Sequence, residues 1–158
     1  MNRRKDILGL IAFLLLCLVV SGIGGAITAT TVGTWYQALQ KPPFNPPDWI
    51  FAPVWTTLYV LMAIAGWRVW RRVGYRANVM PLRAFALQLT LNLAWSFVFF
   101  GMQAIGPALV EIVFLLAAII ATAALFWRVD RVSGALFLPY ILWVSFAALL
   151  NASLFFLN

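Results

Sequence analysis

Five long apolar runs, each of about 20 residues, leave this chain few folds to choose from. A helix needs about 20 apolar residues to cross roughly 30 Å of hydrocarbon. Each run is expected to be helical, because inside that layer the backbone must satisfy its own hydrogen bonds. The sequence predicts an all-α integral membrane protein with one domain, residues 1–158, a bundle of five transmembrane helices at residues 7–29, 49–70, 82–102, 107–127 and 135–157.

Composition narrows the chemistry further. The chain is 65% hydrophobic and only 9% charged, so most of it cannot face water. It has no histidine, and Cys17 is its single cysteine. These counts exclude a Ser–His–Asp triad, a disulfide within the chain and the usual ligands of zinc or haem iron. With no paired carboxylates and no phosphate loop, the sequence leans away from an enzyme and predicts no required cofactor and no metal site.

The basic residues are divided unevenly between the two ends of the predicted helices. Ten of the eleven fall on the side of the N-terminus: Arg3, Arg4, Lys5, Arg68, Arg71, Arg72, Arg76, Arg83, Arg128 and Arg131. The other side carries only Lys41. This bias predicts a cytoplasmic N-terminus, with the first loop and the C-terminus outside. The positive charge therefore reflects membrane topology, and we expect no nucleic-acid partner.

The first loop is unusually rich in aromatic residues and proline. The stretch 35–59 contains five prolines and the aromatic residues Trp35, Tyr36, Trp49 and Trp55. Proline fixes φ and disfavours helix at the preceding residue, so residues 41–48 are expected to be a stiff, extended lid. Asp48 is expected to cap the second helix. A stiff aromatic lid over a membrane bundle indicates a binding site.

The third predicted helix carries Gln88, Asn92 and Trp95 on one face, at i, i+4 and i+7. Amides are costly in lipid, so this face should point into the bundle. It either lines a site or makes hydrogen bonds that only hold helices together. The two interpretations stay open for Asn92, and the second is favoured for Gln88.

The fifth predicted helix offers a similar stripe. Pro139 removes an amide donor and frees the carbonyl of Ala135, which should either kink the helix or leave a polar spot. The stripe that follows is Tyr140, Trp143, Ala147 and Asn151. It is either a cavity wall, with Ala147 leaving room for a flat ligand, or ordinary core packing.

The second helix adds Trp55 and Tyr59, again at i and i+4. Three helices and the lid thus each place Trp or Tyr beside a hydrogen-bonding group. Together they predict a pocket in which aromatic faces stack on a planar, largely apolar molecule.

Two other features are ambiguous. Glu111 is the only acid inside a predicted span, so it is either functional or near enough to the surface to reach water. Small residues recur every four positions in the first and third predicted helices, a spacing that lets helices approach closely; the stripe on the third helix is either a dimer seam or an internal helix contact. These stripes are Ser21, Gly25 and Ala29; Gly22, Ala26 and Thr30; and Ala86, Thr90 and Ala94.

Motifs along nearly the whole chain resemble the TspO/translocator-protein family, the tryptophan-rich sensory proteins also called peripheral benzodiazepine receptors. The first loop reads WYxxLxKPxFxPPxW and the second helix opens with PVWTTLY. The third helix carries QLxxNLAW followed by FFG, and the fifth carries LPYxLW. The combination of the loop motif with LPYxLW is the specific part of this resemblance.

The resemblance implies a five-helix bundle, commonly a homodimer, that binds protoporphyrin IX and related tetrapyrroles. Some members bind cholesterol or benzodiazepine-type drugs, but the sterol pattern expected near the end of the fifth helix is missing here. Carried over by motif, the ligand contacts are Trp35, Tyr36, Pro47, Trp55, Asn92, Trp95, Trp143 and Ala147. The expected role is tetrapyrrole transport, sensing or stress response. The alternatives are a light- and oxygen-dependent porphyrin-degrading enzyme and a scaffold subunit without a ligand.

Overall fold

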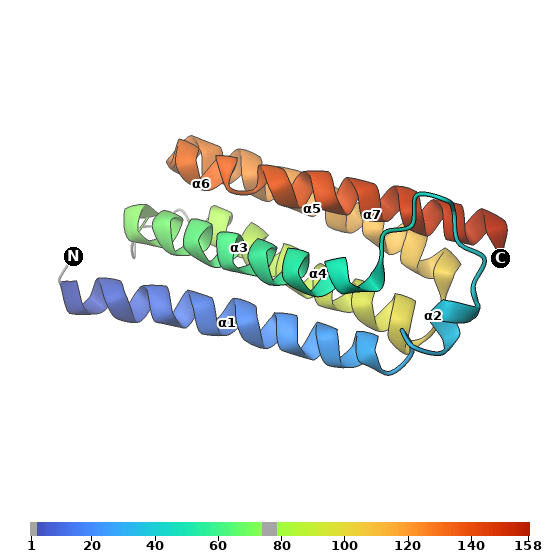
Figure 1. Cartoon of the computed structure of the whole chain (residues 1–158). Coiled ribbons are helices and arrows are strands. Elements are labelled where there is room, and N and C mark those ends of the chain that lie inside the picture. The colour runs from blue at the N-terminus through green and yellow to red at the C-terminus, as the bar shows by residue number, and fades with distance from the viewer. Residues whose placement is uncertain (1–2, 74–78) are drawn as a thin grey trace.

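The computed structural model describes residues 3–73 and 79–158 as a bundle of helices lying side by side (Figure 1). The described part contains no strand. Five of its helices, with their short extensions, are long and apolar enough to cross a membrane. The long helices are α1 (Arg3–Ala29), α3 (Phe51–Val73), α4 (Met80–Ser96), α5 (Ile105–Val129) and α7 (Leu138–Leu157). The predicted fold class is therefore confirmed.

Short elements extend or link these helices. In the first loop, α2 (Trp35–Ala38) and the 3-10 turn η1 (Asp48–Ile50) precede α3. The π-helix η2 (Phe97–Gly101) continues α4, and α6 (Arg131–Ala135) precedes α7. Pro81 lies in the first turn of α4 and Pro139 in the first turn of α7, where a missing amide donor costs least.

The fifth predicted helix is interrupted near the point where a kink was expected. The chain leaves α6 at Ala135, turns through Leu136 and Phe137, and re-enters helix at Leu138. The Phe137 amide donates to the Gly134 carbonyl at 3.1 Å, a tighter turn than an α-helix makes. Pro139 thus starts a new helix, whereas the sequence predicted one kinked helix.

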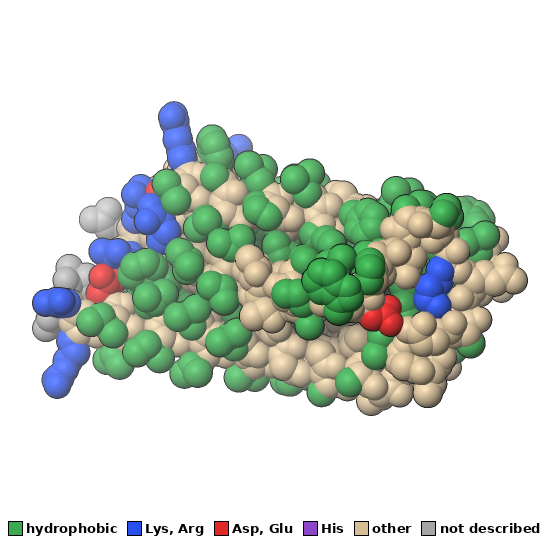
Figure 2. All heavy atoms as spheres, viewed as in Figure 1, with side chains coloured by type: hydrophobic (Ala, Val, Ile, Leu, Met, Phe, Trp, Pro, Cys, Tyr) green, Lys and Arg blue, Asp and Glu red, His purple; other side chains and the backbone are tan. Residues whose placement is uncertain are grey.

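One half of the bundle, here called the basic half, holds the N-terminus, the end of α3 and α6 (Figure 1). Figure 2 shows Lys and Arg side chains gathered at that end. Arg68 Nε lies 2.7 Å from Asp130 Oδ2, and Arg72 lies 3.0 Å from the other carboxylate oxygen. Asp130 also caps α6 by accepting the Ser133 amide at 3.2 Å. These contacts join α3 to the α5–α6 turn.

The opposite half, here called the lid half, is covered by the lid (residues 30–50). Residues 41–47 contain no helix, and a turn is closed by the Asn45 amide donating to the Pro42 carbonyl at 3.0 Å. The expectation that Asp48 caps the second helix was wrong. The N-cap of η1 is Pro47, and the Asp48 carboxylate accepts a hydrogen bond from the Gln37 side chain instead.

Candidate ligand-binding site

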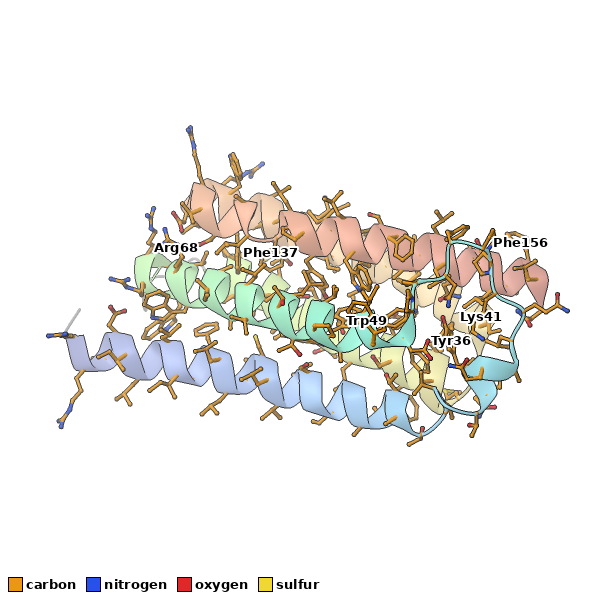
Figure 3. All side chains as sticks on the ribbon, viewed as in Figure 1. Tyr36, Lys41, Trp49, Arg68, Phe137 and Phe156 are labelled. Carbon is orange, nitrogen blue, oxygen red and sulfur yellow. The ribbon has the colours of Figure 1, made fainter. Side chains whose placement is uncertain are left out.

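A cavity of about 470 Å³ lies in the lid half, between the segments of α1, α3, α4 and α7 that are nearest the lid. This volume is within the range of small-molecule sites, roughly 300–1,000 Å³. Tyr36 and Lys41 of the lid lie at this end of the bundle, opposite Arg68 (Figure 3). Of the eleven predicted site residues, those that line the cavity are Tyr36, Trp55, Tyr59, Asn92, Trp95, Trp143 and Ala147.

The floor of the cavity is the end of a buried hydrogen-bonded chain. The Tyr59 hydroxyl donates to Asn92 Oδ1 at 2.7 Å. Asn92 Nδ2 donates to the Tyr140 hydroxyl at 2.5 Å, and that hydroxyl donates to Gln88 Oε1 at 3.0 Å. All four side chains are buried. The side-chain amides of Asn92 and Gln88 hold the tyrosine hydroxyls in place through these hydrogen bonds. Tyr59 and Asn92 therefore face the cavity in a fixed orientation.

Gln88 and Tyr140 lie one layer below the floor and do not line the cavity. Gln88 is fully buried, and its Nε2 lies 3.6 Å from Met62 Sδ. The interpretation favoured for Gln88, an interhelical hydrogen bond, is what the structure shows. Tyr140 packs against Trp55 with ring centroids 6.3 Å apart, so it supports a wall residue from behind.

The walls are aromatic and come from several helices. Trp95 stacks on Phe99 with ring centroids 5.0 Å apart, and its indole donates to Asn151 Oδ1 at 3.2 Å. Trp143 packs edge-on against Phe51 at 6.0 Å. Among the described residues, the Trp143 Nε1 donor is buried and has no hydrogen-bond partner. A buried indole donor usually finds a partner, so this unpaired donor is unusual.

The lid is fastened by side-chain hydrogen bonds. The Tyr36 hydroxyl donates to Asn45 Oδ1 at 2.8 Å. The Asn158 side chain makes two hydrogen bonds with the backbone of Gln40. It accepts from the Gln40 amide at 2.9 Å and donates to the Gln40 carbonyl at 3.0 Å. Burial, with a smaller contribution from the nearby Asp48 charge, raises the pKa of Tyr36 to about 12. Tyr36 therefore remains a neutral hydrogen-bond donor at physiological pH.

Two further predicted residues lie outside the cavity wall. Trp35 packs against Phe99 at 5.5 Å and so supports the wall from outside. Pro47 is exposed and precedes η1. Both belong to the lid, but neither lines the cavity.

The sequence did not identify two parts of the wall. One is formed by small residues of α1, including Gly24, Gly25 and Thr28; of these three, the sequence singled out only Gly25, as part of a helix-contact stripe. The other is the π-helix η2, which brings Phe99 and Phe100 to the cavity. π-Helical segments are rare and often accompany functional sites, but FVFFG carries no recognisable signal for one.

Glu111 lies on α5 and does not line the cavity. Both of its carboxylate oxygens are buried and have no hydrogen-bond partner among the described residues. The suggestion that it reaches water is therefore not what the structure shows.

Comparisons with known proteins agree on one family. A sequence model of the TspO/MBR family matches residues 13–157. The tryptophan-rich protein TspO of Chlorobaculum tepidum is 42% identical over 157 residues, covering 98% of this chain and 99% of the relative. Protein CrtK of Rhodobacter capsulatus is 39% identical, covering 87% and 86%. The translocator protein of Bos taurus is 38% identical, covering 89% and 85%.

Proposed function

The chain belongs to the TspO/MBR family of multi-pass membrane proteins, and from this premise we propose that its lid-half cavity binds tetrapyrroles such as protoporphyrin IX. One observation carries the proposal. Trp55, Trp95 and Trp143, from three different helices, surround one cavity above a polar floor. Indole faces favour stacking on a flat, conjugated molecule, and a few fixed polar groups orient it.

We also propose that the N-terminus lies in the cytoplasm and that the lid faces the other side. The uneven division of basic residues supports this orientation, because cytoplasmic ends of membrane helices carry an excess of Lys and Arg. In the structure, Lys41 lies at the lid end and Arg68 at the opposite end (Figure 3). Arg76, one of the ten basic residues counted for the cytoplasmic side, lies outside the described residues.

A titration of the detergent-purified protein with protoporphyrin IX tests the binding proposal, with tryptophan emission as the signal. We expect saturable quenching at about one ligand per chain. Trp143→Phe removes the unpartnered donor and part of the stacking surface. Aromatic contacts are worth about 0.5–1.5 kcal/mol each, so the affinity should fall by about two- to tenfold.

Trp127→Phe is the matched control. Trp127 is about half exposed on α5 and does not line the cavity, so its substitution also removes one indole but should leave the affinity unchanged. An absence of saturable quenching in the unmodified protein would reject tetrapyrrole binding. Equal weakening by both substitutions would show that the ligand binds elsewhere.

A further inference from the structure

A second, smaller hollow lies in the basic half, at the opposite end of the bundle from the cavity. It has a volume of about 210 Å³, and the described residues that line it are Arg68, Arg71 and Arg72. These residues stand at i, i+3 and i+4 near the end of α3, so they share one face of that helix (Figure 3). Their side chains are 30%, 43% and 55% exposed, so a group arriving from outside the bundle can reach all three. We call this site the arginine hollow.

Positive charge exceeds negative charge around the arginine hollow. Arg68 and Arg72 share one carboxylate, that of Asp130, at 2.7 and 3.0 Å. Asp130 carries a single negative charge, so one of these two guanidinium charges stays uncompensated. Arg71 is paired separately, with Asp6 of α1 at 2.7 Å. In the described part of the chain, the basic half holds nine Lys and Arg residues but only these two acids. The hollow therefore attracts an anion.

The arginines also keep hydrogen-bond donors for such an anion. Each guanidinium carries five N–H donors in a planar fork. Arg68 and Arg71 meet their carboxylates through Nε, and no contact with the described residues uses their terminal nitrogens. Arg71 also lies over the Trp67 ring, 4.8 Å from its centre, a contact that occupies a face of the guanidinium and leaves its N–H edge open. Guanidinium forks bind phosphate through pairs of parallel hydrogen bonds, so the donors fit a phosphate group.

The arginine hollow lies where lipid headgroups supply phosphate. The span that contains α3, Asp48–Val73, has 26 residues and is about 39 Å long, more than the roughly 30 Å of the hydrocarbon core. The end of α3 therefore extends into the headgroup layer, and Trp67 and Trp70 in the same turns are typical of a membrane interface. On α1, Ile7 and Leu8 are more than half exposed, so they offer an apolar surface to acyl chains next to the basic end.

From this arrangement we infer that the arginine hollow binds the headgroup phosphate of an anionic phospholipid. The excess positive charge favours an anionic headgroup over a zwitterionic one, and basic pockets between membrane helices commonly bind acidic lipids. A phosphate held here would bridge Arg71, which is paired with α1, and the two arginines that are paired with the α5–α6 turn. The inference concerns the end of the bundle opposite the cavity and does not depend on tetrapyrrole binding.

Native mass spectrometry of the full-length protein in nonionic detergent tests the inference. Phosphatidylglycerol and phosphatidylcholine with the same acyl chains are titrated separately, and the affinity for the first bound lipid is compared. Phosphatidylglycerol should bind about fivefold more tightly, the effect of about one charge near a basic surface. Arg72→Gln should weaken phosphatidylglycerol binding by about tenfold or more, because a hydrogen bond to a charged group is lost. Equal affinities for the two lipids in the unmodified protein would overturn the inference.

Two further variants separate this site from diffuse charge and from misfolding. Arg83→Gln removes one charge from the same end of the bundle, but Arg83 is exposed on α4 and does not line the hollow, so its phosphatidylglycerol affinity should change less than about twofold. Arg71→Gln leaves both contacts to Asp130 in place and should weaken phosphatidylglycerol binding as Arg72→Gln does, even if Arg72→Gln fails to fold. If Arg83→Gln weakens binding as much as Arg71→Gln, only diffuse charge attracts the lipid.

Inorganic phosphate distinguishes a lipid headgroup from a free anion. Thermal unfolding of the unmodified protein is followed with phosphatidylglycerol, with phosphatidylcholine or with inorganic phosphate at equal concentration. Phosphatidylglycerol should raise Tm, because a ligand that binds the folded protein stabilises it. Inorganic phosphate should leave Tm unchanged, because it lacks the acyl chains that hold a lipid beside α1. An equal rise with inorganic phosphate would assign the hollow to a free anion and reject the lipid.

Discussion

The basic half and the lid half are made from the same long helices, but their glycines differ in surroundings. Two glycines of the basic half lie in close contact with aromatic rings, whereas two of the lid half border open space. In the basic half, a Cβ added at Gly66 would lie 2.8 Å from the Phe13 ring, and one at Gly9 would lie 2.3 Å from the Trp70 ring. Glycine there admits an aromatic side chain between α1 and α3. In the lid half, a Cβ at Gly22 or Gly25 of α1 would meet no atom of the described residues within 4 Å.

The two halves also differ in what holds them together. Phe85 stacks on Phe126 with ring centroids 5.8 Å apart, and Asp130 ties two arginines to the α5–α6 turn. The lid half depends on a polar floor and a hydrogen-bonded lid around a cavity. Stability should therefore reside mainly in the basic half, while the lid half is free to be shaped by ligand binding. Three substitutions test this division.

Gly134→Ala should have the largest effect on stability. A Cβ at Gly134 would lie 2.7 Å from Trp127 Cβ and 2.8 Å from Trp127 Cα. Because one of these atoms is backbone, the α5–α6 turn itself must shift. Overpacking of this kind costs about 1–3 kcal/mol, and a backbone clash belongs at the upper end. Thermal unfolding in a nonionic detergent should show a clear drop in Tm.

Gly22→Ala is the matched control in the lid half. The added methyl group meets open space, and alanine favours helix over glycine by up to about 1 kcal/mol. Its Tm should equal or slightly exceed that of the unmodified protein. If both alanine variants lose the same stability, the contrast between the two halves is wrong.

Asp130→Asn should have the second largest effect. The hydrogen bond from Arg68 is the main cause that lowers the pKa of Asp130 to about 2, and Ser133 and the Arg72 charge add to it. The ordinary value is 3.8, and one pKa unit corresponds to about 1.4 kcal/mol. The ionised carboxylate thus contributes about 2 kcal/mol near neutral pH. Because the folded pKa is depressed, this contribution is complete above about pH 4 and is lost as the pH falls towards 2.

The measurement is Tm between pH 7 and pH 2 for the unmodified protein and for Asp130→Asn. The variant should begin less stable and lose less across the acidic window. Asp6→Asn is the control. Asp6 Oδ1 lies 2.7 Å from Arg71 Nε but makes no hydrogen bond within the described part of the chain, and the Arg71 side chain is 43% exposed. Such a pair is worth about 0–1 kcal/mol. If Asp130→Asn and Asp6→Asn lower Tm by the same amount, Asp130 does not contribute more to stability than an exposed ion pair does.

The fold could be predicted from the sequence because the length of an apolar run and the position of a proline are local signals. The five spans and the start of α4 at Pro81 follow from such signals, whereas the start of a separate helix at Pro139 was expected only as a kink. Asn92, Trp95 and Trp143 could be predicted to face the interior because aromatic and amide side chains share a helix face there. The buried hydrogen-bonded chain from Tyr59 to Gln88 could not be predicted in the same way. It depends on how three helices are aligned along the bundle, and no single segment contains that information.

The features that were missed depend on contacts between distant segments. Asp130 lies in what the sequence presents as a short basic turn, and its partner Arg68 is 62 residues away. Asp48 lies where a helix cap is expected, but its carboxylate accepts a hydrogen bond from the Gln37 side chain of the same loop instead of capping the helix. The stripe of small residues around Gly25 has the same spacing whether it contacts a helix or borders a cavity. Pattern alone cannot separate these two uses.

Gly25→Leu should have the smallest effect on stability and therefore tests the comparison most finely. A Leu at Gly25, which borders the cavity, projects into open space and should change Tm little. It should nevertheless weaken porphyrin binding by about 5- to 150-fold, since a side chain that crowds the bound ligand costs about 1–3 kcal/mol. Gly22→Leu, on the same helix but outside the cavity wall, should leave the affinity unchanged. A large fall in Tm for Gly25→Leu would mean that α1 packs as tightly in the lid half as in the basic half.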